Sequence, residues 1–168
     1  YGQGEAPMTI TALSKSFHAD TNHPRYFERL GSAGIARSDV EVRVVDAEDR
    51  DLPPGEVGEV LVRGDVVMRG YWNNPQASAE TLRGGWLHTG DLGVWDSDGF
   101  LKIIGRKKEI LVTAGGKNVW PAALEAKLNA SRYISQSMVA GDGEKSLGAL
   151  IVPEKSNLLA WARETSLP

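Results

Sequence analysis

The sequence has no cysteine and only three histidines among its 168 residues. The lack of cysteine excludes disulfides and thiolate metal sites, and three histidines argue against a histidine-rich metal centre. Nowhere do about 18 apolar residues follow one another, so these residues contain no candidate membrane-spanning helix. Lysine and arginine number 19 against 22 aspartate and glutamate residues. This balance argues against a nucleic-acid-binding protein, and the cytoplasm is the expected location.

The composition is that of a folded globular protein, with 41% apolar and 24% charged residues. The chain begins with a glycine-rich turn, Tyr1-Gly-Gln-Gly-Glu5, and such turns usually join two elements. It stops at Pro168, directly after a predicted helix. We therefore expect a fragment of a longer polypeptide, with residues 1–35 disordered or packed against other molecules.

The first two thirds of the chain predict a β-rich unit with one helix. Val40, Val42 and Val44 alternate with charged residues, which is typical of a strand with one buried face. Asn74 and Pro75 suit the N-cap and first position of a helix that runs to residue 82. Further strands are predicted at 58–63, 90–95 and 100–104, and a strand or extended segment at 66–72.

From residue 109 the order of elements changes to a mixed α+β pattern. The sequence predicts strands at 109–113, 134–140 and 147–152 and helices at 121–130 and 156–165. The charged stretch Gly105–Lys108 lies between the two patterns and is the natural boundary. We therefore predict two domains, residues 1–106 and 107–168, in an α+β fold.

Four short motifs could carry chemistry, and each has an ordinary structural alternative. Glycines in Tyr1–Glu5 let a ligand approach the backbone, with an aromatic ring and a carboxylate beside it, although a plain turn explains them as well. Asp91 follows a Thr-Gly turn and could accept both hydroxyls of a ribose, or could simply cap that turn. Arg106 could bind phosphate or ribose oxygens, or belong to a solvated charged run.

The fourth motif, Thr113-Ala-Gly-Gly-Lys-Asn118, precedes a helix and superficially suggests a phosphate loop. It lacks the Gly-x4-Gly-Lys-Ser/Thr spacing that such a loop needs. His88 is the obvious acid–base candidate, but the sequence names no partner to position it. Trp120, beside the Gly-Gly pair, is the one tryptophan that we would place near a ligand; the other tryptophans are expected to pack.

Taken in order, these motifs resemble the adenylate-forming family of acyl-CoA synthetases, luciferases and peptide-synthetase adenylation domains. The resemblance rests on Tyr-Gly-x-x-Glu, Trp-x-x-Thr-Gly-Asp, Asp-Gly-Phe, Gly-Arg-x-Lys-Glu and Gly-Gly-Lys-Asn-Val-x-Pro-x-x-Leu-Glu. It covers nearly the whole chain. The blocks 105–119 and 142–153 look most like long-chain fatty acyl-CoA ligases. The implied fold is a distorted antiparallel β-barrel-like subdomain, the end of a large AMP-binding domain, followed by a truncated α+β lid.

The resemblance implies an enzyme that activates a fatty acid with ATP and Mg²⁺ as an acyl-adenylate and transfers it to CoA. Tyr1 resembles the residue that stacks on adenine, and Glu5 resembles the Mg²⁺ ligand. Asp91 resembles the acceptor for the ribose hydroxyls, with Arg106 beside it. Lys108 falls at the hinge of the lid. Gly115, Gly116, Lys117 and Asn118 are similar to a loop that faces the active site near the pantetheine path.

The chain also departs from the family pattern. Gly4 stands where the family often has Thr or Ser, which puts a direct phosphate contact from this turn in doubt. The family's Ser/Thr/Gly-rich phosphate loop and its C-terminal catalytic lysine have no counterpart here, so we predict that the isolated chain does not adenylate. The alternatives are an aryl- or medium-chain acyl-CoA ligase, an acyl-AMP ligase that loads a carrier protein, or a non-catalytic partner-binding module. Peripheral membrane association of the intact enzyme is left open.

Overall fold

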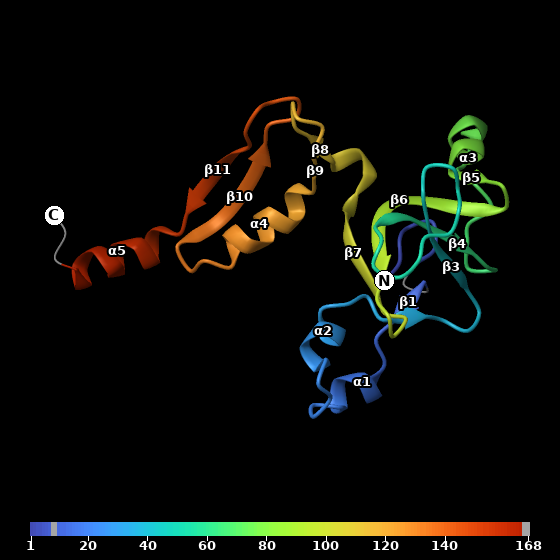
Figure 1. The fold of residues 1–168 in the computed structure, drawn as a ribbon, viewed down its shortest axis with the longest axis horizontal. Helices are drawn as coiled ribbons and strands as arrows, with labels where there is room; N and C mark the ends of the chain where they lie inside the picture. Colours follow the sequence, from blue (N-terminus) through green and yellow to red (C-terminus); the bar gives the residue numbers. More distant parts are fainter. Residues whose placement is uncertain (8–9, 166–168) are drawn as a thin grey trace. The chain divides into compact units, whose positions relative to one another are not determined.

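A computed structural model describes residues 1–7 and 10–165 of the chain. The chain divides into two compact units, Tyr1–Lys107 and Lys108–Pro168. Figure 1 shows the elements of both units. No helix among the described residues has the length and apolar character needed to cross a membrane.

The first unit is organised around a five-stranded antiparallel sheet. Its strands are β3 (Glu41–Val45), β4 (Gly58–Arg63), β5 (Leu82–Arg83), β6 (Trp86–Trp95) and β7 (Leu101–Arg106). The order is β3-β4-β6-β5, and β7 pairs with the second half of the long strand β6. The antiparallel arrangement expected from the sequence is confirmed. The sheet is open, however, and the described residues form no closed barrel.

Strand β4 lies in the centre of this sheet, and its residues explain why it does. Residues 59–62 are all buried, so the strand is covered on both faces and the run Val60-Leu61-Val62 suits it. The core around them also contains Val44, Leu87 and Leu101, together with Ala6 and Ile10 from the N-terminal segment. Burying each such aliphatic side chain contributes about 1.5–3 kcal/mol, which makes this cluster the main source of stability in the unit.

The N-terminal segment is folded onto its own unit, so the expectation of disorder for residues 1–35 is wrong for its described part. Strand β1 (Thr11–Ala12) pairs with β2 (Ile35–Ala36), and helices α1 (Lys15–Ala19) and α2 (Tyr26–Leu30) lie between them in the sequence. The guanidinium of Arg29 stacks on Phe17 and Phe100, and Arg25 forms ion pairs with Asp96 and Asp98. Residues 8 and 9 lie outside the described residues.

The segment between β4 and β5 contains one helix, as predicted, and a loop where the sequence predicted a strand or extended segment. Helix α3 (Pro75–Thr81) begins as predicted, because Asn74 accepts a hydrogen bond from the Ala77 amide and Pro75 occupies the first turn. Residues 66–72 form an irregular loop and not a strand. Hydrogen bonds from this loop go to other groups: the Met68 amide donates to the Glu5 carbonyl and the Tyr71 amide donates to Ser78 Oγ.

The second unit consists of two hairpins and two helices, close to the sequence prediction. Strands β8 (Leu111–Val112) and β9 (Asn118–Val119) form one hairpin; β10 (Ile134–Ala140) and β11 (Gly148–Pro153) form the other. Helix α4 (Pro121–Asn129) packs against β10, and α5 (Lys155–Glu164) follows β11 (Figure 1). The predicted strand 109–113 is shorter, because a 3-10 turn, Lys107–Glu109, occupies its start.

The core of the first unit predicts a large effect of truncating Leu87, which is 1% exposed. We expect Leu87→Ala to lower the free energy of unfolding by about 2–5 kcal/mol, because it leaves a cavity between packed strands. Urea unfolding followed by tryptophan fluorescence measures the change. The control is Val57→Ala, at a side chain that is 39% exposed. Equal losses for the two variants would contradict this account of the core.

Candidate functional site

A bulge in β6 presents the candidate ribose acceptor. Leu61 pairs with His88 and Glu59 pairs with Leu92, so two steps along β4 correspond to four along β6. The two extra residues fall within the segment Thr89-Gly90-Asp91, and Gly90 has a φ of 69°, in the left-handed region that favours glycine. Such bulges redirect a side chain out of the regular alternation. The motif recognised in the sequence is therefore a bulge at the centre of the sheet.

Side chains satisfy the backbone groups that the bulge leaves without strand partners. Thr89 Oγ1 donates to the Val60 carbonyl at 2.7 Å and accepts from the Asp91 amide at 3.1 Å. Gln3 Nε2 donates to the Thr89 carbonyl at 3.0 Å. The Gly90 amide donates to Glu59 Oε1 at 3.2 Å. These bonds make the turn a fixed feature of the strand, since buried backbone groups are costly to leave unpaired.

The carboxylate of Asp91 has three partners from two parts of the chain, the N-terminal segment and the end of β7. Tyr1 Oη and Gln3 Nε2 each donate to Oδ2 at 2.6 Å, and Arg106 Nε lies 3.2 Å from Oδ1. Asp91 is 6% exposed, whereas the Arg106 side chain is 63% exposed. A carboxylate has about four acceptor directions. To accept two ribose hydroxyls it must therefore exchange partners, and the exposed Arg106 is the one that can move away most easily.

The phenol of Tyr1 is held neutral in this cluster. Burial raises its pKa well above the ordinary value, and the hydrogen bond to the Asp91 carboxylate raises it further. A neutral phenol is the form that can donate to the carboxylate. The hydroxyl of Tyr1 thus lies at the carboxylate expected to bind ribose.

Glu5 has the donor chemistry for magnesium but is linked to a different neighbour. Tyr71 Oη donates to Glu5 Oε1 at 2.5 Å, and this hydrogen bond raises the pKa of the Tyr71 phenol. The described residues contain no cluster of three or more metal-ligating side chains. Magnesium bound with nucleotides commonly uses one or two carboxylates plus phosphate oxygens, so a single half-buried Glu5 fits that mode.

His88 lies in a buried acidic environment beside Glu59 of β4. Its Nδ1 is 3.6 Å from Glu59 Oε2, and its Nε2 is 3.9 Å from Asp49 Oδ2. Nδ1 has no hydrogen-bond partner among the described residues. The side chain is only 4% exposed. His88 is therefore placed as a packing residue beside Glu59, and it has no open access to a substrate.

The candidate residues of the second unit lie around the first hairpin. Gly115, Gly116, Lys117 and Asn118 are exposed at and beside its turn, and Lys108 is exposed at the start of the unit. Thr113 closes the turn, because its carbonyl accepts from the Gly116 amide at 2.8 Å and its hydroxyl accepts from the Lys117 amide at 3.2 Å. The loop is a tight, surface-exposed hairpin turn and forms no phosphate-binding helix start.

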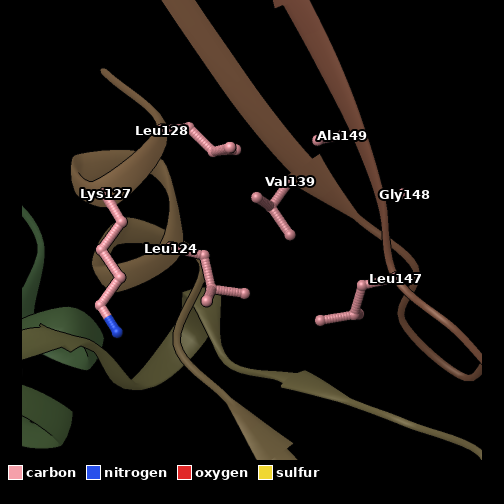
Figure 2. A pocket seen from close by; sticks show the side chains of 7 residues that line it. All are labelled: Leu124, Lys127, Leu128, Val139, Leu147, Gly148 and Ala149. Carbon is pink, nitrogen blue, oxygen red and sulfur yellow. The ribbon is translucent and has the colours of Figure 1, made fainter. Parts of the chain in front are cut away.

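An apolar groove of about 270 Å³ lies between α4 and the β10–β11 hairpin of the second unit. Figure 2 shows Leu124 and Val139 pointing into the space between the helix and the strands, with Lys127 at one side. None of the residues proposed from the sequence lines this groove. Trp120, the tryptophan suspected of touching a ligand, is half-buried, and its indole nitrogen has no partner among the described residues.

Of the residues proposed from the sequence, the structure brings Tyr1, Asp91 and Arg106 together. Three contributors were missed by the sequence analysis: Gln3, Glu59 and Tyr71. Gln3 could have been found, because it lies two residues after Tyr1 and an extended segment places such residues on one side. No local signal connects Glu59 or Tyr71 to the site, since both act through partners distant in the sequence.

Comparison with known proteins identifies the family of the chain. The chain matches the AMP-binding enzyme family over residues 1–72 and the AMP-binding enzyme C-terminal domain over residues 108–165. The chain belongs to the AMP-binding enzyme family. The resemblance inferred from the motifs is thereby confirmed, and the relatives place the family branch among acyl- and aryl-CoA ligases.

Among curated relatives, the long-chain-fatty-acid–CoA ligase FadD15 of Mycobacterium tuberculosis is 46% identical over 80% of this chain and 23% of its own length. A feruloyl-CoA synthase of Amycolatopsis is 35% identical over 97% of this chain and 33% of its own length. This AMP-binding chain therefore spans about a quarter to a third of these relatives.

Among solved structures, O-succinylbenzoate CoA synthetase (MenE) of Bacillus subtilis in complex with AMP superimposes with a TM-score of 0.78. It is 32% identical, and the match covers 98% of this chain and 33% of that one. The fold prediction is confirmed in class, as the neighbours are adenylate-forming enzymes with mixed α and β structure.

The Asp91 cluster predicts a shift in a tyrosine titration. We expect Asp91→Asn to lower the pKa of the Tyr1 phenol, because the variant removes the anion that disfavours phenolate. Absorbance at the phenolate band, recorded against pH, follows the four tyrosines, and Tyr1→Phe identifies the Tyr1 transition.

The raised pKa of Tyr1 in the folded state also determines how the stability of the chain changes with pH. The contribution of Tyr1 is complete below the unfolded pKa of about 10 and is lost as the pH rises toward the folded pKa. A Tyr1 transition at the same pH in the wild-type chain and in Asp91→Asn would contradict the assignment.

Proposed function

We propose that this chain belongs to an ATP-dependent ligase that joins a carboxylic acid, most simply a long-chain fatty acid, to CoA through an acyl-adenylate. The observation that carries the proposal is the Asp91 carboxylate, fixed in a strand bulge beside Tyr1 and Arg106. A buried acid that already binds three donors is built to accept hydrogen bonds, and a ribose diol supplies two. The family membership provides the reaction class.

In this proposal, the residues of the first unit bind and orient the nucleotide. Asp91 accepts the ribose hydroxyls when Arg106 moves off Oδ1 toward the phosphate side. The ring of Tyr1, held by its hydroxyl next to the sugar, stacks on adenine. The oxygen of Glu5 that Tyr71 leaves available would hold Mg²⁺, which neutralises phosphate charge when bound.

The division of labour between the units is also part of the proposal. Lys108 acts as the hinge, residues 1–106 end the AMP-binding domain, and residues from 107 begin a lid that carries Gly115–Asn118 toward the pantetheine path. Support comes from the division of the chain after Lys107 and from the C-terminal family match that begins at residue 108. A moving lid would let one site serve the adenylation and thioester steps in turn.

The fatty-acid assignment rests on the relatives named long-chain-fatty-acid–CoA ligase, FadD15 among them. The feruloyl-CoA synthase and an indoleacetate–CoA ligase of Aromatoleum aromaticum make an aryl acid the alternative. ATP, Mg²⁺ and CoA are the proposed cosubstrates and cofactor, and the cytoplasm is the proposed location. The 168-residue chain alone is proposed to be inactive, since it spans only a third or less of such enzymes.

The test is carboxylate-dependent exchange between ATP and labelled pyrophosphate, catalysed by the full-length protein with palmitate or ferulate. We expect palmitate to support exchange and Asp91→Ala to lower kcat/KM for ATP about a hundredfold, as two hydrogen bonds to a charged acceptor are lost. Asp39→Ala is the matched control, because Asp39 pairs only with Arg37 on the surface among the described residues.

Each outcome of this test supports a different function for the protein. Preference for ferulate would replace the fatty acid by an aryl acid. No exchange by the full-length protein with either acid would leave a non-catalytic binding module. Exchange by the isolated 168-residue chain would show that the proposed inactivity is wrong.

A further inference from the structure

Glu59 is an acid in a place where the sequence pattern calls for an apolar residue. It lies on the central strand β4, next to the buried residues Val60 and Leu61, and is 7% exposed. A carboxylate buried in a sheet is costly unless it is paired and hydrogen-bonded. Natural sequences keep such local conflicts mainly at functional sites.

The two oxygens of Glu59 bind two different segments. Oε1 accepts from the Gly90 amide at 3.2 Å, and Oε2 accepts from Lys107 Nζ at 3.0 Å. Burial alone would raise the pKa of this carboxyl, but the hydrogen bond and charge of Lys107 bring the pKa below its ordinary value. Glu59 is therefore an anion that connects β6 to the end of the first unit.

These two segments are the direct neighbours of the candidate ribose-binding pair. Gly90 immediately precedes Asp91, and Lys107 immediately follows Arg106. Asp91 and Arg106 are themselves cross-strand partners in the β6–β7 pairing. One carboxylate thus holds the chain next to both members of the pair, while touching neither side chain in the hydrogen bonds that it makes.

We propose that Glu59 is a positioning residue for nucleotide binding, because it fixes the Thr89-Gly90-Asp91 bulge and anchors Lys107. Strand β7 then stays in place when the side chain of Arg106 leaves Asp91. The inference rests on the proposed function, because it concerns the same nucleotide site. Arg106 and Lys107 are both largely exposed, with side chains 63% and 50% accessible. The Lys107 contact is what keeps this exposed end of β7 in register when Arg106 moves.

A role in stability alone would look different from positioning. A merely structural Glu59 would affect the affinities for ATP and for the carboxylic acid alike, in proportion to the loss of folded protein. A positioning Glu59 affects ATP binding selectively. It also makes the effects of Glu59 and Lys107 non-additive, because the second acts only through the first.

The experiment uses the full-length protein and equilibrium titration with ATP. Four variants are compared with wild type: Glu59→Gln, Lys107→Met, the double variant, and Glu41→Gln as control. Glu41 is matched to Glu59, since it also pairs with a cation, Arg63, but on the exposed edge strand β3. The thermal unfolding midpoint and the KM for the carboxylic acid are recorded for each.

We expect Glu59→Gln to weaken ATP binding roughly tenfold, the size of effect that follows from losing a hydrogen bond to a charged group. Lys107→Met should weaken it roughly threefold to fivefold, and the double variant should be no weaker than Glu59→Gln. The KM for the carboxylic acid should stay within about twofold of wild type in every variant, and Glu41→Gln should match wild type throughout.

Wild-type ATP affinity in Lys107→Met, or additive effects in the double variant, would overturn the inference. Equal losses for ATP and carboxylic acid would overturn it as well. If Glu59→Gln does not fold, Lys107→Met decides, because it changes an exposed side chain. Failure of the wild-type protein to bind ATP would refute the proposed function instead, so the two failures are distinguishable.

Discussion

The bulge in β6 is the constraint on which the candidate site depends. In a regular strand, side chains alternate between the two faces, and the position of Asp91 would follow from the register. The two extra residues opposite β4 change that position, and the Asp91 carboxylate contacts Tyr1, Gln3 and Arg106. The bulge exists because its backbone groups find partners in Thr89, Gln3 and Glu59. Local geometry, burial and charge therefore support one another at a single turn.

Much of the fold could be predicted because the local signals agree with the tertiary structure. Strand β4 was predicted with its observed bounds, since a run of apolar residues between two glycine- or charge-rich ends fits a central strand. Helix α3 was predicted because the Asn-Pro pair is a strong start signal. Residues 66–72 misled the prediction: Val66 and Val67 pack against the core, but Trp72 is exposed, and backbone hydrogen bonds of the segment go to Glu5 and Ser78 and not to a neighbouring strand. The resemblance implied a distorted, barrel-like subdomain, and the structure shows its sheet to be open. Sequence patterns indicate which residues are in strands and not whether a sheet closes.

The site could be predicted only in part. Tyr1, Asp91 and Arg106 were found because each belongs to a recognisable motif, and the structure brings them together. Glu59 and Tyr71 have no such signal: Glu59 contacts Lys107 across 48 positions of sequence, and Tyr71 contacts Glu5 across 66. Side chains that support a site from a distance depend on strand register and on the irregularities within it, which the sequence of one chain does not reveal.

The most direct test of the account is the contribution of the ribose hydroxyls to binding. Affinities of the full-length protein for ATP and for 2′,3′-dideoxy-ATP are measured by titration, in wild type and in Asp91→Ala. The account predicts that wild type binds the dideoxy nucleotide at least about tenfold more weakly than ATP, and that Asp91→Ala binds the two equally. Undiminished discrimination in Asp91→Ala would show that another group reads the ribose, and the bulge would then have no role in recognising it.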